Sequence, residues 1–386
     1  MSVFIHHLST LVPPHAYSQE QLCARLTEWQ QNPLTARLTR QLFRRSAIAR
    51  RYSVLPDFHP ETEPELFHRD GRGRLLAPST GARNACYVRH ANDLSVQLAR
   101  QTLAECQEFD ASDITHVITV SCTGFYNPGP DYAIVTQLGL PPSVERYHLG
   151  FMGCYAALPA LRMAQQFCRT RPDAVVLVIC LELCSLHLQL SDQPDSALAN
   201  TLFSDGAAAA LVSARPPSGK KPALVLEHFR SALATEGKKD MAWTVGDSGF
   251  NLVLSSYVPE VIAANIAALV DDLLLDTPRC RQELDWWAVH PGGRAILDQV
   301  EKSLDLRAEQ ITDSRSVLRD YGNMSSATIL FVLQRLLERR ETVPRSVCAM
   351  AFGPGLTIET ALLEMRPATC GRMGNQPKES AALAAA

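Results

Sequence analysis

Three short segments, far apart along the chain, carry side chains that could act together in covalent catalysis. The first segment is GCYAA, in which Cys154 lies between apolar sequence ending near Met152 and a helical run over 161–168. A thiol beside a helix N-terminus meets unpaired backbone N–H groups and the positive end of the helix dipole, and both lower its pKa. This setting predicts a nucleophile. A buried structural thiol is the alternative, and Pro159 indicates that the regular helix begins after Cys154.

The other two segments supply an imidazole and an amide. His290 ends the strand-like run WWAVH and is followed by Pro-Gly-Gly, a turn in which the backbone can pass close to a ligand. Asn323 lies in YGNMSSA, where small residues lead into a helical pattern. Its simplest role there is that of a helix N-cap. A structural histidine at a strand end is likewise the plain alternative for His290.

Together the three side chains suit one reaction. A thiolate paired with an imidazolium can take an acyl group from a thioester. The same imidazole and a neutral amide can then donate hydrogen bonds to the oxygen of an enolate. Forming that enolate by decarboxylation needs no strong base and no metal. The sequence has no H-E-x-x-H or similar spacing, so we predict no metal and no bound cofactor.

The remaining sequence predicts the elements that position these residues. Apolar runs of strand length alternate with helical patterns, which is typical of an α/β protein whose sheet is buried on both faces. A polar, proline-rich break follows at 215–222, after which the alternation repeats. We predict two halves of similar plan, at 1–218 and 219–366, and a frayed tail over 367–386. The expected strands are 114–121, 174–180, 207–212, 224–229, 286–290 and 346–352; the expected helices are 20–50, 91–108, 154–168, 259–276, 292–304 and 323–338.

Composition excludes several classes of protein. The 386 residues are 46% hydrophobic and 20% charged with a net charge of −3, which gives no reason to expect a nucleic-acid partner. The longest apolar run, 174–183, is too short to span a membrane, and no signal peptide is visible. Eleven cysteines form an odd set without a C-x-x-C pair, which favours free thiols over disulfides or zinc. We therefore expect a cytoplasmic protein.

The ordered segments GCYAA, AVHPGGRAILDQVE, YGNMSSATILFVL and AFGPGLTIE resemble the type III polyketide synthases, the chalcone and stilbene synthase family. The resemblance covers most of the chain. It implies a thiolase-like αβαβα fold built from two duplicated halves, and a homodimer. It also implies a catalytic triad of Cys154, His290 and Asn323, acting on malonyl-CoA and an acyl-CoA starter without a carrier protein.

The resemblance assigns further positions. Phe203 matches an aromatic residue that shields the thiolate, Pro354 matches a residue lining the site, and Arg45 matches a residue that contacts coenzyme A phosphates. The neighbouring basic positions of the family pattern are Leu38 and Gln41 here. Four pocket residues depart from the plant chalcone synthases and would change the volume and hydrogen bonding around a growing chain: Cys184, His187, Trp243 and Leu252.

The segments GCYAALPAL and ELCSLHLQ are more similar to bacterial alkylresorcinol and alkylpyrone synthases, which take fatty acyl starters. The expected activity is therefore decarboxylative Claisen condensation of malonyl-CoA onto a fatty acyl-CoA, giving an alkylpyrone or alkylresorcinol.

Three other functions are open to the same residues. Cys…His…Asn is also the chain order of papain-like proteases, although those place the cysteine near the mature N-terminus. A ketoacyl synthase III or a hydroxymethylglutaryl-CoA synthase would share the fold. A catalytically silent binding partner is the third alternative, against which the intact triad argues.

Overall fold

A computed structural model describes residues 1–255 and 257–369. Nine strands form one mixed sheet in the order β11-β12-β13-β8-β1-β7-β6-β4-β5. In chain order they are β1 (Val3–Leu11), β4 (His116–Ser121), β5 (Glu145–Gly150), β6 (Val175–Leu183), β7 (Asp205–Ser213), β8 (Ala223–Leu233), β11 (Trp286–Val289), β12 (Arg345–Gly353) and β13 (Thr357–Arg366). Two small antiparallel sheets pair β2 (His15–Ser18) with β3 (Arg50–Ser53), and β9 (Met241–Gly246) with β10 (Gly249–Leu254).

The helices fall into a central pair, two outer groups and a group at one end of the molecule. Their bounds are α1 (Gln19–Trp29), α2 (Pro33–Arg45), α3 (Thr80–Cys106), α4 (Pro130–Leu138), α5 (Ala157–Thr170), α6 (Pro194–Leu202), α7 (Val258–Leu274), α8 (Arg294–Ser303), α9 (Thr312–Tyr321) and α10 (Thr328–Leu337). No described helix is long and apolar enough to cross a membrane.

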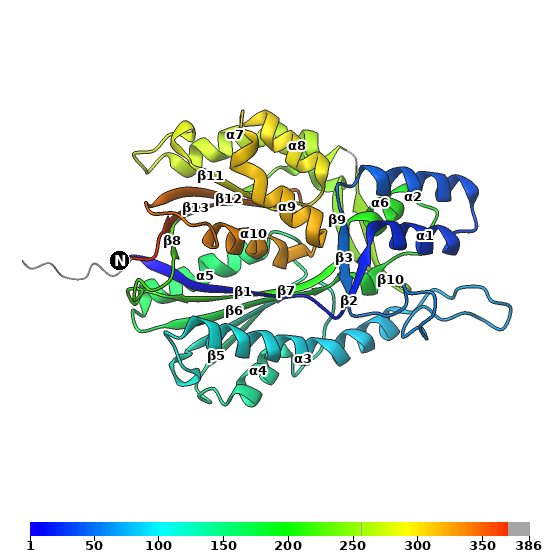
Figure 1. Cartoon of the computed structure of the whole chain (residues 1–386), viewed down its shortest axis with the longest axis horizontal. Helices are drawn as coiled ribbons and strands as arrows, with labels where there is room; N and C mark the ends of the chain where they lie inside the picture. Colours follow the sequence, from blue (N-terminus) through cyan, green and yellow to red (C-terminus); the bar gives the residue numbers. More distant parts are fainter. Residues whose placement is uncertain (256, 370–386) are drawn as a thin grey trace, which may run out of the picture.

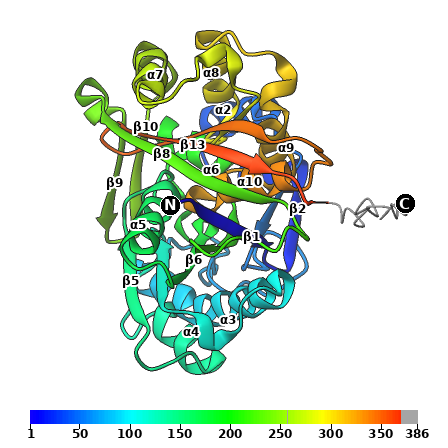
Figure 2. The same cartoon turned by 90° about the vertical axis from the view of Figure 1, so that its left-hand side faces the viewer.

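The elements stack in five layers, as Figure 1 shows. Helices α7 and α8 cover strands β11 to β13, helices α5 and α10 lie in the middle, and α3 and α4 cover the far side of β6 and β7 (Figures 1 and 2). The order is therefore α-β-α-β-α, the predicted thiolase-like arrangement. Helices α1, α2 and α6 gather with the two small sheets at one end of this stack (Figure 1).

Alternate residues of the buried strands explain why the sheet carries helices on both faces. Odd and even positions of a strand point to opposite faces, so a fully apolar strand needs cover on both. In β6, Val176 and Val178 face the central helices, whereas Leu177 and Ile179 face α3 and α4. Strand β12 divides its side chains in the same way between the central core and the core beneath α7 and α8.

The two central helices occupy equivalent places in the two halves. Helix α5 precedes β6, which runs parallel to β4, and α10 precedes β12, which runs parallel to β11. Both helices pack their apolar faces into the same central core. This duplication brings the segment before α5 and the segment before α10 to one end of the molecule.

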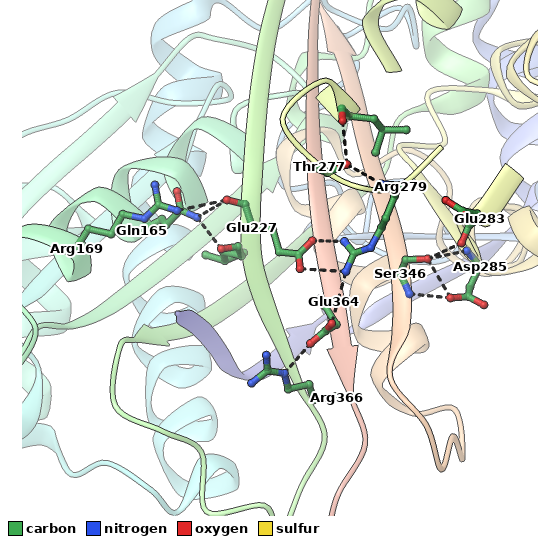
Figure 3. Close-up of polar contacts among 12 residues, drawn as sticks. Gln165, Arg169, Glu227, Thr277, Arg279, Glu283, Asp285, Ser346, Glu364 and Arg366 are labelled. Carbon is green, nitrogen blue, oxygen red and sulfur yellow. Dashed lines mark hydrogen bonds and ion pairs between the residues drawn. The ribbon is translucent and has the colours of Figure 1, made fainter. Parts of the chain in front are cut away.

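The two sheet layers are joined where β1 pairs with β8, over Val3–Ile5 and Leu224–Leu226. Polar contacts also connect β8 with α5 and with the neighbouring strand β13 (Figure 3). Gln165 of α5 donates to the Leu226 carbonyl at 2.7 Å, while Arg279 pairs with Glu227 of β8 and lies 3.6 Å from Glu364 of β13. The side chains of these ion pairs are 21–26% exposed, so the pairs are intermediate between surface pairs, which contribute about 0–1 kcal/mol each, and fully buried ones.

Several predicted boundaries were wrong. Helix α3 begins at Thr80, where the Ser79 side chain caps it, well before the predicted start at residue 91. Strand β5 was missed because ERYHLG is polar and largely exposed. The division into halves at 218/219 stays a prediction, and most of the proposed tail, 370–386, lies outside the described residues.

Candidate active site

Cys154 follows β5 in a turn just before α5. The helix starts at Ala157 with Ala156 as its cap, three residues later than the predicted range 154–168 but after Cys154, as Pro159 indicated. Gly153 has a positive φ of 99°, and its N–H donates to the Cys122 sulfur at 3.0 Å. This turn places the Cys154 thiol partly exposed, at the wall of a cavity.

Glycine at position 153 is required by sterics as well as by its backbone angle. A Cβ there would come 2.5 Å from Pro354 Cδ, whereas one on Gly139, with φ of +67°, would meet nothing within 4 Å. We expect Gly153→Ala to lower the free energy of unfolding by about 2–4 kcal/mol and Gly139→Ala by about 1 kcal/mol. Urea unfolding of both variants measures the difference. Equal losses would show that the contact with Pro354 is unimportant.

His290 comes directly after β11, where its backbone N–H still donates to the Met350 carbonyl of β12 at 2.8 Å. The side chain is only 1% exposed. Neither ring nitrogen has a hydrogen-bond partner within the described residues. A buried polar group without a partner is uncommon and costs about 1–3 kcal/mol, so this imidazole is ready to bind a group that enters the cavity.

Asn323 is not the N-cap of a helix, which corrects the expectation for that residue. Its backbone pairs with the segment that ends α6, where its N–H donates to the Leu202 carbonyl and its own carbonyl accepts from Ser204 N–H, both at 2.9 Å. The side-chain Oδ1 accepts from Ser325 N–H at 2.9 Å, and Nδ2 donates to the Gly292 carbonyl at 3.3 Å. These bonds fix the amide with one N–H still free to donate.

The three side chains line one cavity, which we call the reaction cavity. Cys154 Sγ lies 4.0 Å from Asn323 Oδ1. Pro354, from the turn after β12, lines it as well, and so do four further residues named from the sequence: Cys184, Phe203, Trp243 and Leu252. The structure thus brings together eight of the ten residues that the sequence singled out.

A second cavity adjoins the first, and we call it the side cavity. The two cavities share Cys184, Phe203, Trp243 and Leu252, which together we call the partition. His187 lines only the side cavity. Its far walls come from residues that sequence reasoning missed: Tyr17, Leu22, Leu26, Phe58 and Phe250.

Arg45 is the tenth residue, and it lies apart from both cavities. It is the last residue of α2, and its side chain is exposed to solvent. The arginine that the structure brings to the side cavity is Arg51. It is buried and donates to the Asn200 carbonyl at 2.9 Å and the Phe203 carbonyl at 2.7 Å. No local signal separates Arg51 from its exposed neighbours, because its partners are distant in sequence.

Glu182, at the end of β6, is a second buried charged residue that sequence reasoning missed. Its carboxylate accepts from Cys122 N–H at 2.9 Å, Thr123 Oγ1 at 3.0 Å and Ser326 Oγ at 2.6 Å. Burial raises its pKa. The carboxyl group therefore ties the loop after β4 to the segment that follows Asn323.

A group of possible metal ligands, Glu65, Cys86 and His90, lies on and beside α3 rather than in either cavity. The Glu65 carboxylate already pairs with Arg89 at 2.7 Å and with His90 at 3.0 Å. A guanidinium at that distance opposes a cation, so we assign the group a structural role.

Burial favours the neutral forms of both the Cys154 thiol and the His290 imidazole. It raises the pKa of the Cys154 thiol to about 11 and lowers that of His290 to about 3. The predicted lowering of the Cys154 pKa was therefore wrong. The regular helix begins only after the thiol, and the loss of hydration outweighs the hydrogen bonds near the sulfur. With a pKa of about 11, only on the order of one thiol in 10⁴ is ionised at pH 7, so a thiolate needs a nearby group to take its proton.

His290 is the group in the reaction cavity that could take this proton, because forming the ion pair offsets the cost of burying each charge. We expect His290→Ala to slow alkylation of Cys154 by iodoacetamide at pH 7 at least tenfold. Since the thiolate reacts and its fraction grows as pH rises through the pKa, the variant's rate should keep increasing toward pH 11. Rates measured from pH 6 to 10 test this. An identical profile in the parent and the variant would exclude His290 as the proton acceptor.

The five-layered fold, with a cysteine, a histidine and an asparagine on the wall of one cavity, is that of a thiolase-like condensing enzyme. Comparison with known proteins agrees. The family models for the N-terminal and C-terminal domains of chalcone and stilbene synthases match residues 3–216 and 228–367. The chain is 32% identical to the alpha-pyrone synthesis polyketide synthase-like Pks18 of Mycobacterium tuberculosis, covering 94% of this chain and 91% of the relative.

Solved structures are similar over nearly the whole chain. PKS-I of the brown alga Ectocarpus siliculosus superposes with a TM-score of 0.86 at 28% identity, covering 95% of this chain and 98% of the alga's. The fungal type III polyketide synthase ORAS gives a TM-score of 0.81 at 27% identity, with 95% and 100% covered. The chain belongs to the chalcone and stilbene synthase family. It is a type III polyketide synthase, an enzyme of the acyltransferase class that condenses malonyl-CoA.

Proposed function

We propose that this enzyme extends a fatty acyl group from coenzyme A with malonyl units and releases an alkylpyrone or alkylresorcinol. The observation that carries the proposal is the reaction cavity, which is lined by Cys154, His290 and Asn323 and adjoins a mostly apolar side cavity. The mycobacterial relative, whose name assigns it to alpha-pyrone synthesis, supports a pyrone product.

Loading is the first step. His290 takes the Cys154 proton, and the thiolate attacks the carbonyl carbon of the acyl-CoA. The tetrahedral intermediate collapses with loss of the coenzyme A thiolate, which receives the proton from the imidazolium. The products are the acyl-enzyme and free coenzyme A.

Condensation follows in the same cavity. Malonyl-CoA loses carbon dioxide, and the electron pair of the broken bond forms an enolate whose oxygen accepts hydrogen bonds from His290 Nε2–H and the free N–H of Asn323. The enolate carbon attacks the acyl carbonyl, and the Cys154 thiolate leaves. The product is a β-ketoacyl-CoA, which returns to Cys154 for another round or cyclises.

The apolar lining of the side cavity favours an aliphatic starter. Its lining includes Leu22 and Leu26 of α1 together with Phe58, all buried, and it lies directly behind the partition. Burying each methylene of a chain there contributes about 0.8 kcal/mol. A long chain should therefore lower KM more than a short one, until the cavity is full.

Product analysis tests the proposal. The purified enzyme is incubated with malonyl-CoA and, in turn, acetyl-, benzoyl-, hexanoyl-, dodecanoyl- and hexadecanoyl-CoA, and products are identified by mass spectrometry. We expect kcat/KM to be highest for a long-chain acyl-CoA, with pyrones or resorcinols as products. Efficient turnover of benzoyl-CoA, without turnover of the fatty acyl-CoA starters, would contradict the proposed fatty acyl starter.

We also propose that the protein is a homodimer formed along β5. This strand ends the sheet and pairs only with β4 among the described strands. Phe125 and Tyr132, beside it, are 42% and 49% exposed. Two such edges can pair, and the aromatic side chains would be covered in the process. Light scattering should give twice the mass of the chain.

Two further assignments rest on the family resemblance and on chemistry. Arg45 would contact the coenzyme A phosphates from the exposed end of α2, since guanidinium groups bind phosphate well. A reactive Cys154 needs a reducing compartment, which favours the cytoplasm.

A further inference from the structure

Two buried nitrogen atoms, on neighbouring rings that line the side cavity, have no hydrogen-bond partner within the described residues. They are Nδ1 of His187 and Nε1 of Trp243. Each costs the folded protein about 1–3 kcal/mol for as long as it is unpaired. Buried polar atoms are normally satisfied. Unpaired nitrogen atoms on two rings whose centroids lie 6.2 Å apart beside one cavity therefore indicate a ligand with a polar group that pairs with both.

The hydrogen-bond capacity of each atom follows from its surroundings. His187 Nε2 lies 2.7 Å from the Thr123 carbonyl oxygen, which can only accept, so Nε2 carries the ring proton. Burial lowers the His187 pKa to about 4, which keeps the ring neutral. Nδ1 is therefore an acceptor, whereas the indole Nε1–H of Trp243 can only donate.

Packing fixes both rings beside the side cavity. His187 is only 7% exposed and stacks on Phe250 with ring centroids 3.9 Å apart and planes 12° from parallel. Trp243 lines both cavities, with its centroid 6.2 Å from that of His187 and 6.3 Å from that of Phe203. An acyl chain that runs from Cys154 into the side cavity passes these two rings.

We propose that the rings of His187 and Trp243 recognise an acyl chain that carries a hydroxyl or enol oxygen. The O–H donates to His187 Nδ1, and the oxygen accepts from Trp243 Nε1–H. A hydroxyl group can do both, whereas a saturated chain leaves both nitrogen atoms unpaired. This inference rests on the proposed function, and it names the class of acyl group that the same site prefers.

The oxygen could come from a hydroxyl on the starter or from an enol of the growing polyketide. The shared chemistry is one O–H group beside a saturated chain, and two arms of one experiment separate the sources. The first arm compares kcat/KM for dodecanoyl-CoA and hydroxydodecanoyl-CoA, with the hydroxyl at successive positions. The second arm follows the number of malonyl units added to dodecanoyl-CoA.

Variants that remove one hydrogen-bonding group and keep an aromatic ring are Trp243→Phe and His187→Phe. If the starter supplies the hydroxyl, we expect kcat/KM of the parent enzyme to be about tenfold or more higher for one hydroxylated isomer than for dodecanoyl-CoA. Each variant should lose most of this difference in kcat/KM. If the polyketide supplies an enol, the parent shows no such preference, and both variants release products with fewer malonyl units.

Trp29→Phe is the matched control, because it makes the same change at an indole whose Nε1 also has no partner within the described residues but which lines neither cavity. This variant should keep both the kcat/KM ratio between the hydroxylated and the saturated starter and the number of malonyl units added. The inference is overturned if the parent shows no starter preference and neither variant changes the product length. It is also overturned if the preference survives in both folded variants, as judged by Tm.

Failure of the proposed function would be seen separately in the same reactions. Absence of an acyl group on Cys154 with every starter would refute the loading step itself, and the inference would fall with it. Loading and extension of dodecanoyl-CoA without any effect of the two variants would refute the inference alone.

Discussion

Cys154→Ala should take up no acyl group from any acyl-CoA, and product formation should fall on the order of 10⁴-fold or more. The reason is that the proposed mechanism has a single covalent intermediate, which forms on a single sulfur atom. Intact-protein mass spectrometry after brief incubation with dodecanoyl-CoA measures loading, and chromatography measures product. An acyl adduct on the variant would contradict the assignment.

Cys184 provides a matched control for this prediction, since its thiol lines the same cavity. Burial and the neighbouring Glu182 carboxylate raise its pKa, so it should remain a thiol. Cys184→Ala is expected to accept one acyl group per chain. If Cys184→Ala lost loading while Cys154→Ala kept it, the roles of the two cysteines would have to be exchanged.

Asn323→Ala should slow decarboxylation of malonyl-CoA by about 10²–10³ while loading from acyl-CoA survives. The amide N–H is one of two proposed donors to the enolate oxygen, and removing one preorganised donor to a developing oxyanion has about this effect. Loading does not pass through the enolate. Release of carbon dioxide and the mass of the acyl-enzyme, measured in parallel, separate the two steps.

Asn323→Asp separates the role of this side chain as a hydrogen-bond donor to the enolate oxygen from its structural role. It keeps an oxygen that can accept from Ser325 N–H, but it lacks the N–H groups of the amide. We expect it to decarboxylate as slowly as Asn323→Ala, with a Tm closer to that of the parent. Equal loss of loading and decarboxylation in both variants would contradict the proposal that Cys154 carries the acyl group and Asn323 acts only in decarboxylation.

Sequence patterns predicted the layered α/β fold because its strands are apolar on both faces. Runs such as 174–180 and 346–352 can only lie in a sheet covered twice. Strand β5 was not predicted, for the opposite reason. It ends the sheet, so its side chains are polar and its pattern resembles a loop.

The side chains of the site were easier to predict than their electrostatics. Cys154, His290 and Asn323 stand in distinctive local sequences, and the duplicated halves bring those segments to one cavity. The pKa of Cys154 depends on how deeply distant elements bury it, and no local pattern reports that. The prediction from the helix dipole therefore had the wrong sign.

Arg45 and Arg51 illustrate the same limit. Both belong to the stretch RRSAIARRY, in which every arginine looks solvent-exposed. Only the fold shows that Arg51 is buried against the backbone of Asn200 and Phe203, whereas Arg45 faces solvent. Likewise, the side cavity is built from α1, the loop at Phe58 and the β9–β10 hairpin, which no single motif links.

The most direct test of the account follows one acyl group through the reaction cavity. The enzyme is loaded with dodecanoyl-CoA, freed of excess thioester, digested and mapped by mass spectrometry, before and after a chase with malonyl-CoA. We predict a dodecanoyl group on the peptide that contains Cys154, which disappears in the chase as ketide products form. An acyl group on another residue, or one that stays on Cys154 through the chase, would contradict the claim that this thiol, His290 and Asn323 act on the same thioester.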